Sequence, residues 1–215
     1  MKSDPHNEGL RILIADDHAI FRQGLAAMLA REAHWLVCLE CGDGQSALDG
    51  IRNLSPDVAI LDHSMPKLTG LEVLHALADD VTETRVIVLS SFGSGVLVSE
   101  GLNAGAAGWV VKEDAFDDLV GAIKLVIDGG LFVSPSVDQH ELSEAQCSTP
   151  VSVRELEVLR GLAAGMSSKE VAARHGLSPR TVETYRMRLM AKFSARNSME
   201  LLQKAMQAGL LESHA

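Results

Sequence analysis

The chain has no long hydrophobic run, and none of its apolar stretches approaches the roughly 20 residues that a membrane-spanning helix needs. The first residues are polar and lack the apolar core of a secretory signal. Residues 1–9 are therefore predicted to form a disordered N-terminus. We expect a cytoplasmic protein with no membrane partner.

Cysteine is also scarce, with three residues in a chain of 215. This number does not make a disulfide framework. Cys38 and Cys41 have C-x-x-C spacing, but no second pair accompanies them and Cys147 is distant in the sequence. The sequence therefore argues against redox or structural zinc chemistry at this pair.

The net charge of −10 is unevenly distributed. Residues 151–215 contain 10 Lys and Arg against 6 Asp and Glu, a balance of +4, so residues 1–150 carry −14. A polyanion would be repelled by the first part and tolerated by the second. Chance could produce such unevenness, but the motifs below divide the chain at the same place.

Strand-like and helix-like patterns alternate over the first 130 residues. Short apolar runs occur at residues 10–15, 35–40, 58–61, 85–89 and 108–111, and each is followed by a segment with helical periodicity. Five such units predict a doubly wound (βα)5 parallel sheet over residues 10–130, with helices on both faces.

Polar residues follow several of these runs and would meet at the carboxyl edge of the sheet. They are Asp16, Asp17, Asp62, Ser90 and Lys112. Clustered carboxylates repel one another unless a cation lies among them, and oxygen ligands with open water positions suit Mg²⁺. An exposed carboxylate there could attack phosphorus, while a metal ion and a lysine neutralise the phosphoryl oxygens.

Asp62 taken alone would more often be a turn or capping residue, and only the complete set favours a reactive site. Pro66 and Gly70 predict a loop after it, with Gly70 supplying an unusual φ. His18 and His63 flank the predicted pocket, and we expect both to lie outside the coordination sphere of the metal.

The acidic pair, the Asp-x-x-Met-Pro-x-x-x-Gly stretch from Asp62, Ser90 and Lys112 together resemble the receiver domain of two-component response regulators. The resemblance implies that Asp62 accepts a phosphoryl group from a histidine kinase and that Lys112 pairs with that group.

The same resemblance implies a Mg²⁺ site and a switch. The implied metal ligands are Asp16, Asp17, Asp62 and the backbone carbonyl of Ser64. Ser90 would move to bond the phosphoryl group, and Trp109 occupies the place of an aromatic that changes rotamer between states. A core aromatic is an equally good interpretation of Trp109.

Residues 131–150 are polar and rich in turn residues, and we predict a linker there. Four short helical patterns follow in residues 151–215, with predicted caps at Ser152, Ser167 or Ser168, and Ser178. Two short helices joined by a glycine-containing turn form a helix-turn-helix. A plain packing or dimerisation unit is the alternative that this spacing argues against.

The third of these helices is predicted to be the recognition helix, with an outward face suited to a major groove. The residues predicted to contact DNA are Lys169, Arg180, Thr181, Glu183, Thr184, Met187 and Arg188. Lys169 and Arg180 lie near helix N-termini, where backbone N–H groups also favour phosphate. Arg186 lies nearer the inward face, where an ion pair with Glu155 and a phosphate contact are equally good interpretations.

The strings at residues 153–159, 165–172 and 177–185 resemble the LuxR-type helix-turn-helix, so the whole chain resembles a NarL/FixJ-subfamily response regulator. The analogy implies base-facing positions at Glu183, Thr184 and Met187. The first and third are lysine in relatives, and Glu183 repels phosphate, so we expect modest affinity for DNA. Val153 also departs from the proline that the family often has.

We therefore expect a transcription regulator, not an enzyme, that binds double-stranded promoter DNA and pairs as a homodimer on phosphorylation. A receiver could still catalyse its own phosphorylation and dephosphorylation. One alternative is constitutive DNA binding with an inert receiver. Another is an aspartyl-phosphate phosphatase, which Ser64 argues against because that class usually has a second aspartate there.

Overall fold

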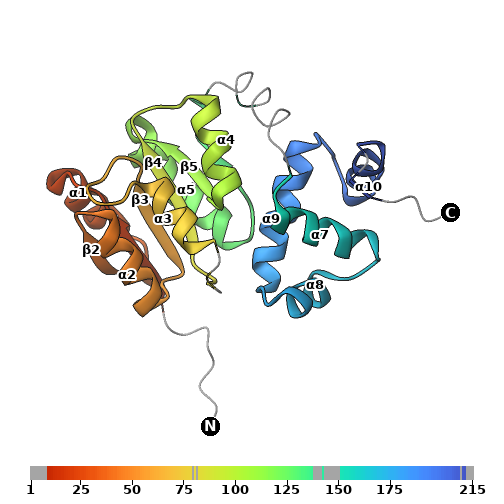
Figure 1. Cartoon of the computed structure of the whole chain (residues 1–215). Helices are drawn as coiled ribbons and strands as arrows, with labels where there is room; N and C mark the ends of the chain where they lie inside the picture. Colours follow the sequence, from red (N-terminus) through yellow and green to blue (C-terminus); the bar gives the residue numbers. More distant parts are fainter. Residues whose placement is uncertain are drawn as a thin grey trace, which may run out of the picture.

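The structure is a computed structural model and describes residues 9–78, 80, 82–137, 142, 151–208 and 210–211. Residues 1–8 of the predicted N-terminus, most of the predicted linker and Cys147 lie outside these ranges. The two parts expected from the sequence are present, a sheet covered by helices and a group of helices (Figure 1).

The first part is a parallel six-stranded sheet with strand order β2-β1-β3-β4-β5-β6. Its strands are β1 (Leu10–Ala15), β2 (Trp35–Cys41), β3 (Val58–Asp62), β4 (Arg85–Ser90), β5 (Gly108–Val111) and β6 (Phe132–Val133). The helices between them are α1 (Ala19–Leu29), α2 (Gly44–Leu54), α3 (Gly70–Leu77), α4 (Gly95–Ala104) and α5 (Ala115–Ile127). The predicted doubly wound (βα)5 sheet is confirmed, with one further strand at its edge.

That further strand, β6, lies where the sequence predicted the start of a linker. It pairs with β5, and Ser134 just after it is fully buried. The Ser134 hydroxyl accepts a hydrogen bond from the backbone N–H of Val111 and donates one to Asp118. A two-residue strand is too short to produce a recognisable alternation, so the sequence pattern could not reveal it.

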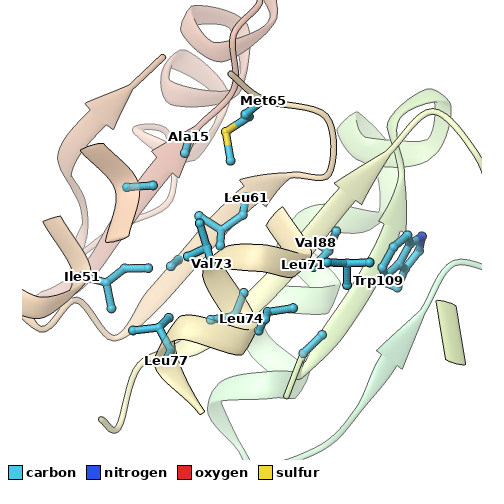
Figure 2. Packing of buried hydrophobic residues seen from close by; sticks show 14 of the residues in the cluster. Ala15, Ile51, Leu61, Met65, Leu71, Val73, Leu74, Leu77, Val88 and Trp109 are labelled. Carbon is cyan, nitrogen blue, oxygen red and sulfur yellow. The ribbon is translucent and has the colours of Figure 1, made fainter. Parts of the chain in front are cut away.

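Side chains of the central strands alternate between two apolar layers. Leu13 and Leu61 face the layer formed with α2, α3 and α4. Figure 2 shows Leu61 in this layer. Ile12 and Ile60 face the layer formed with α1 and α5. This period of two, with both faces covered, explains why the strands are apolar at nearly every position.

Trp109 of β5 is fully buried in the first of these layers. Figure 2 shows its ring beside Leu71. Gly101 of α4 makes room for the ring, because a Cβ atom at residue 101 would lie 2.4 Å from Trp109 Cζ3. The indole therefore occupies a site that only a glycine in α4 leaves open.

The loop after β3 differs from the expectation in one respect. Gly70 was expected to supply an unusual φ, but the positive φ in this loop belongs to Lys67, at 67°. Gly70 begins α3 beside the end of β3, where a Cβ atom would lie 2.7 Å from the backbone oxygen of Asp62. Close approach, not backbone freedom, is the reason for glycine at this position.

The second part consists of α7 (Val153–Ala163), α8 (Ser168–His175), α9 (Pro179–Lys192) and α10 (Ser198–Gln207). Ser152, Ser167 and Ser178 cap the first three of these helices, as predicted, and the first two form capping boxes. The helices enclose a small core of their own around Val158, Val182 and Leu201. The predicted four-helix arrangement is confirmed.

Replacing Gly70 with alanine is expected to lower the free energy of unfolding by about 1–3 kcal/mol, because the new methyl group must displace backbone at the end of β3. Gly121→Ala is the control. Gly121 lies within α5 with open space around its Cα, so alanine should raise stability by about 0.5–1 kcal/mol. Urea denaturation of both variants tests the assignment, and equal effects would contradict it.

Candidate functional site

Three charged side chains meet at the carboxyl edge of the sheet. Asp16 follows β1, Asp62 is the last residue of β3, and Lys112 follows β5. Asp16 is fully buried and Asp62 is 2% exposed. The order of the strands places all three at one edge, as the sequence predicted.

Lys112 forms an ion pair with each of the two buried aspartates. Its Nζ atom lies 2.8 Å from Asp16 Oδ2 and 2.9 Å from Asp62 Oδ2. Burial lowers the pKa of Lys112, but the bonds to the two carboxylates outweigh it, so the net pKa is raised. Lys112 therefore stays charged and holds two like charges together.

The pKa of Asp62 is raised in the folded protein. Burial is the main cause, and the neighbouring Asp16 carboxylate adds to it, while the hydrogen bond and charge of Lys112 oppose the shift. The backbone N–H of Ser64 also donates a bond of 3.2 Å to Asp62 Oδ1. Asp62 is a carboxylate whose charge depends on the cations around it.

Asp17 and His18 lie beside Asp16 and Asp62, and the four residues form a group of potential metal ligands. Ligand atoms of Asp16, Asp17, His18 and Asp62 all lie within 4.8 Å of one another. The His18 ring lies at the exposed rim, with Nδ1 2.6 Å from Asp17 Oδ1. Three carboxylates at this spacing form a donor set that fits Mg²⁺.

Ser90 ends β4, next to β3, and is 1% exposed. Its hydroxyl accepts a hydrogen bond of 3.1 Å from the backbone N–H of Phe92. Trp109, on β5, has its ring centroid 6.0 Å from that of His63, the residue after Asp62. Ser90 thus lies at the pocket's edge of the sheet, paired with the residue before Lys112, whereas Trp109 lies in the apolar layer and approaches the residue after Asp62.

Helix α9 lies beside the sheet domain (Figure 1), and part of its face predicted to contact DNA is buried there. Thr184 and Arg188 are each 5% exposed. Arg85 Nη1 donates to the Thr184 hydroxyl, and Arg188 Nη2 donates to the carbonyl oxygen of Ala106 at 2.9 Å.

Other predicted DNA contacts remain accessible. Lys169, Arg180 and Met187 are exposed, although Arg180 Nη2 also donates to the carbonyl oxygen of Ile127 at the end of α5. Thr181 is half-buried, and its backbone N–H is bonded to the capping Ser178 hydroxyl.

One of the two interpretations of Arg186 is wrong. Arg186 does not pair with Glu155; it binds Glu183, with Nη2 2.7 Å from Oε2. The partner of Glu155 is Lys192, at 2.7 Å in the core of the helical domain. Residue 183 precedes residue 186 by less than one helical turn, which brings the two side chains together on the helix surface.

Arg85 and Lys192 are the charged residues that sequence reasoning missed. Arg85 opens an otherwise apolar strand, and this single cation in a buried run was the available signal. Its partner lies 99 residues away in the chain, and no local pattern encodes a contact between domains.

This geometry defines a receiver-type pocket joined to a helix-turn-helix, and comparison with known families agrees. Residues 12–124 match the response regulator receiver domain, and residues 149–205 match the LuxR family of bacterial regulatory proteins. The chain belongs to the two-component response regulators with a LuxR-type DNA-binding domain, the NarL/FixJ type. This is a family of transcription regulators rather than classical enzymes.

Similar proteins cover the chain almost completely. The transcriptional regulatory protein UhpA of Escherichia coli is 38% identical over 91% of this chain and 97% of its own length. The probable transcriptional regulatory protein NarL of Mycobacterium tuberculosis is 34% identical over 98% of this chain and all of its own length. A solved complex of the response regulator RcsB with DNA has 26% identity and a TM-score of 0.59, and covers 92% of this chain and 98% of RcsB.

Among the described residues, no helix combines the length and apolar character that crossing a bilayer requires.

The raised pKa of Asp62 predicts a pH dependence of stability without metal. A carboxyl whose pKa is higher in the folded than in the unfolded chain stabilises the fold below its unfolded pKa, and this contribution is lost as pH rises through the folded pKa. The stability gain of Asp62→Asn over wild type should therefore grow as the pH rises from about 4, the ordinary pKa of an aspartate, through the higher pKa of the folded protein. The gain should be about 1.4 kcal/mol for each pH unit that separates the two pKa values.

Urea denaturation in a chelator, repeated across this pH range, measures the gain. A difference between variant and wild type that is constant with pH would contradict the assignment.

Proposed function

We propose that phosphorylation of Asp62 by a histidine kinase controls whether α9 can bind double-stranded promoter DNA. One observation carries the proposal. The same sheet holds the acidic pocket at its carboxyl edge and the predicted DNA-binding face of α9 at its opposite edge, through Arg85 and Ala106. Burial of that face opposes DNA binding until the contact opens.

The pocket would perform phosphoryl transfer as follows. Asp16, Asp17, Asp62 and the backbone carbonyl of Ser64 would hold Mg²⁺, which supplies positive charge against the phosphoryl oxygens when bound. An Asp62 carboxylate oxygen would attack the phosphorus of the kinase's phosphohistidine, so that the O–P bond forms as the P–N bond breaks and the kinase imidazole leaves. Lys112 would move its bond from Asp62 to a phosphoryl oxygen. In this way the receiver assists its own phosphorylation and dephosphorylation without acting on other substrates.

Ser90 and Trp109 are the proposed switch residues. The Ser90 hydroxyl, now bonded to the N–H of Phe92, would turn to a phosphoryl oxygen. The cavity that this movement leaves near β4 and β5 would change the packing of the Trp109 ring in its layer. Strand β4 runs from the pocket to Arg85, so a shift there reaches the contact with α9.

Once released, α9 would enter the major groove with Glu183, Thr184 and Met187 toward the bases. Lys169, Arg180, Thr181 and Arg188 are proposed as contacts near phosphate. The proposed functional units are residues 10–130 and 151–215, joined by residues 131–150. The place of action is the cytoplasm, where bacterial promoter DNA lies.

Pairing of two chains would bring two such helices to an inverted repeat. Exposed apolar side chains on neighbouring helices α1 and α5 support a homodimer through this face. Ile20 is 89% exposed and Phe116 is 51% exposed. The Phe116 ring stacks edge-on against Phe21, which fixes it at the surface.

A small-molecule phosphodonor with Mg²⁺ is expected to add one phosphoryl group to the wild-type protein and none to Asp62→Asn, as read by intact mass. Phosphorylation should raise affinity for promoter DNA roughly tenfold, measured at fixed salt because phosphate contacts are salt-dependent.

Lys192→Met is the matched control for Lys112→Met. Lys192→Met removes a buried lysine of the helical domain, which lies far from the pocket. This variant should be phosphorylated at a rate near that of wild type, whereas Lys112→Met should be phosphorylated more slowly. Equal DNA binding by wild type and Asp62→Ala under phosphorylating conditions would contradict the proposal and support a constitutive regulator.

A further inference from the structure

A cavity of about 90 Å³ lies between α9 and the sheet domain, at the start of β4 and before β5. Its walls include Arg85 from one domain and Arg188 from the other. Each of these arginines is 5% exposed. The space is large enough for several water molecules, and thus for a small oxyanion.

Neither arginine has a carboxylate partner among the described residues. Arg85 donates through Nη1 to Thr184, but its Nε and Nη2 atoms have no acceptor there. Arg188 donates through Nη2 to the carbonyl oxygen of Ala106, and its Nε atom has no acceptor in the same set of residues. Guanidinium groups stay charged in proteins, and a buried charge without a counter-charge is strongly unfavourable.

A third cation adds to this imbalance. Burial, and then the nearby charges of Arg180 and Arg188, lower the pKa of Arg85 to about 10. Arg180 is itself fixed by its bond to the carbonyl oxygen of Ile127. Two guanidinium groups, one from each domain, thus line one small space, and the charge of Arg180 acts on Arg85 from outside it.

The acidic residues that line the cavity do not neutralise these cations. Asp80 is already paired, because its Oδ2 atom accepts a hydrogen bond of 2.8 Å from Arg52 Nε. Glu83 is exposed, so water screens most of its attraction for Arg85. Glu155 attracts Arg188 from outside the cavity, but it already pairs with Lys192. The buried guanidinium groups therefore keep an excess of positive charge.

We propose that this cavity is a binding site for a small phosphate-type oxyanion, either inorganic phosphate or a phosphomonoester, held between Arg85 and Arg188. Both arginines line this space, and guanidinium forks suit the several acceptor oxygens of such an anion. An anion bound there joins the two domains, because one arginine comes from each.

A consequence for DNA binding rests on the proposed function of α9. The bound anion stabilises the arrangement in which Thr184 and Arg188 are buried, so it competes with promoter DNA. The site is separate from the acidic pocket, which lies at the other edge of the sheet and repels anions in the absence of Mg²⁺.

Titration calorimetry of the full-length protein with inorganic phosphate, in a chelator and at constant ionic strength, tests the site directly. Wild type is expected to bind phosphate saturably, with one site per chain. Arg85→Met keeps most of the side-chain volume but removes the charge, and should weaken binding at least about tenfold. Arg188→Gln is a second variant with the same expectation.

Arg11→Met is the matched control. Arg11 lies at the same edge of the sheet, where Nη1 donates to the carbonyl oxygen of Leu54 at 2.7 Å, outside the cavity. It should bind phosphate as wild type does. A titration with glycerol phosphate shows whether the site prefers a phosphomonoester to free phosphate. A titration with chloride shows whether the binding is a general effect of salt.

Arg85→Met should also be at least as stable as wild type without phosphate, because it removes a buried charge, and thermal unfolding verifies that it folds. Absence of saturable phosphate or glycerol phosphate binding by wild type would overturn the proposal. So would equal binding by wild type, Arg85→Met and Arg188→Gln. Failure of DNA binding alone would affect the proposed function and leave the anion site intact.

Discussion

The bridge from Lys112 to Asp16 and Asp62 is the interaction on which the sheet domain's chemistry depends. Two aspartates with almost no solvent exposure lie at the ends of neighbouring strands, and their charges repel. One lysine at 2.8 and 2.9 Å allows both to stay in place. The same arrangement makes the pocket responsive, because any change in charge at Asp62 alters what Lys112 binds.

Much of this pocket could be predicted from the sequence, for a simple physical reason. Residues at the carboxyl ends of parallel strands must converge once the strands are identified, so Asp16, Asp62 and Lys112 followed from the alternation of strands and helices. Helix caps such as Ser152 and Ser178 were predictable because they depend on a few adjacent residues. The resemblance to receiver domains added the roles of these three residues, and it added Ser64 and Trp109 as further site residues.

Contacts between distant segments could not be predicted in this way. Arg186 was one candidate partner for Glu155, but the partner is Lys192, because the rotation of α9 about its axis depends on the packing of the whole domain. The strand β6 was too short to detect. The burial of Thr184 and Arg188 depends on how two domains meet, which no periodicity in either domain encodes.

Strand β4 connects the acidic pocket with the contact between the two domains. It begins at Arg85, bonded to Thr184 of α9, and ends at Ser90, beside the pocket. A strand buried at every position moves as a unit, since its neighbours leave no space for local adjustment. The sheet itself is therefore the physical element through which the pocket and the DNA-binding helix can influence each other.

Hydrogen–deuterium exchange of the full-length protein tests this coupling most directly. With phosphodonor and Mg²⁺, wild type is predicted to exchange faster at the segment around Ala106 and in α9, while Asp62→Asn stays unchanged. Phosphorylated wild-type protein with unaltered exchange in both segments would contradict the claim that the two domains separate when Asp62 is modified.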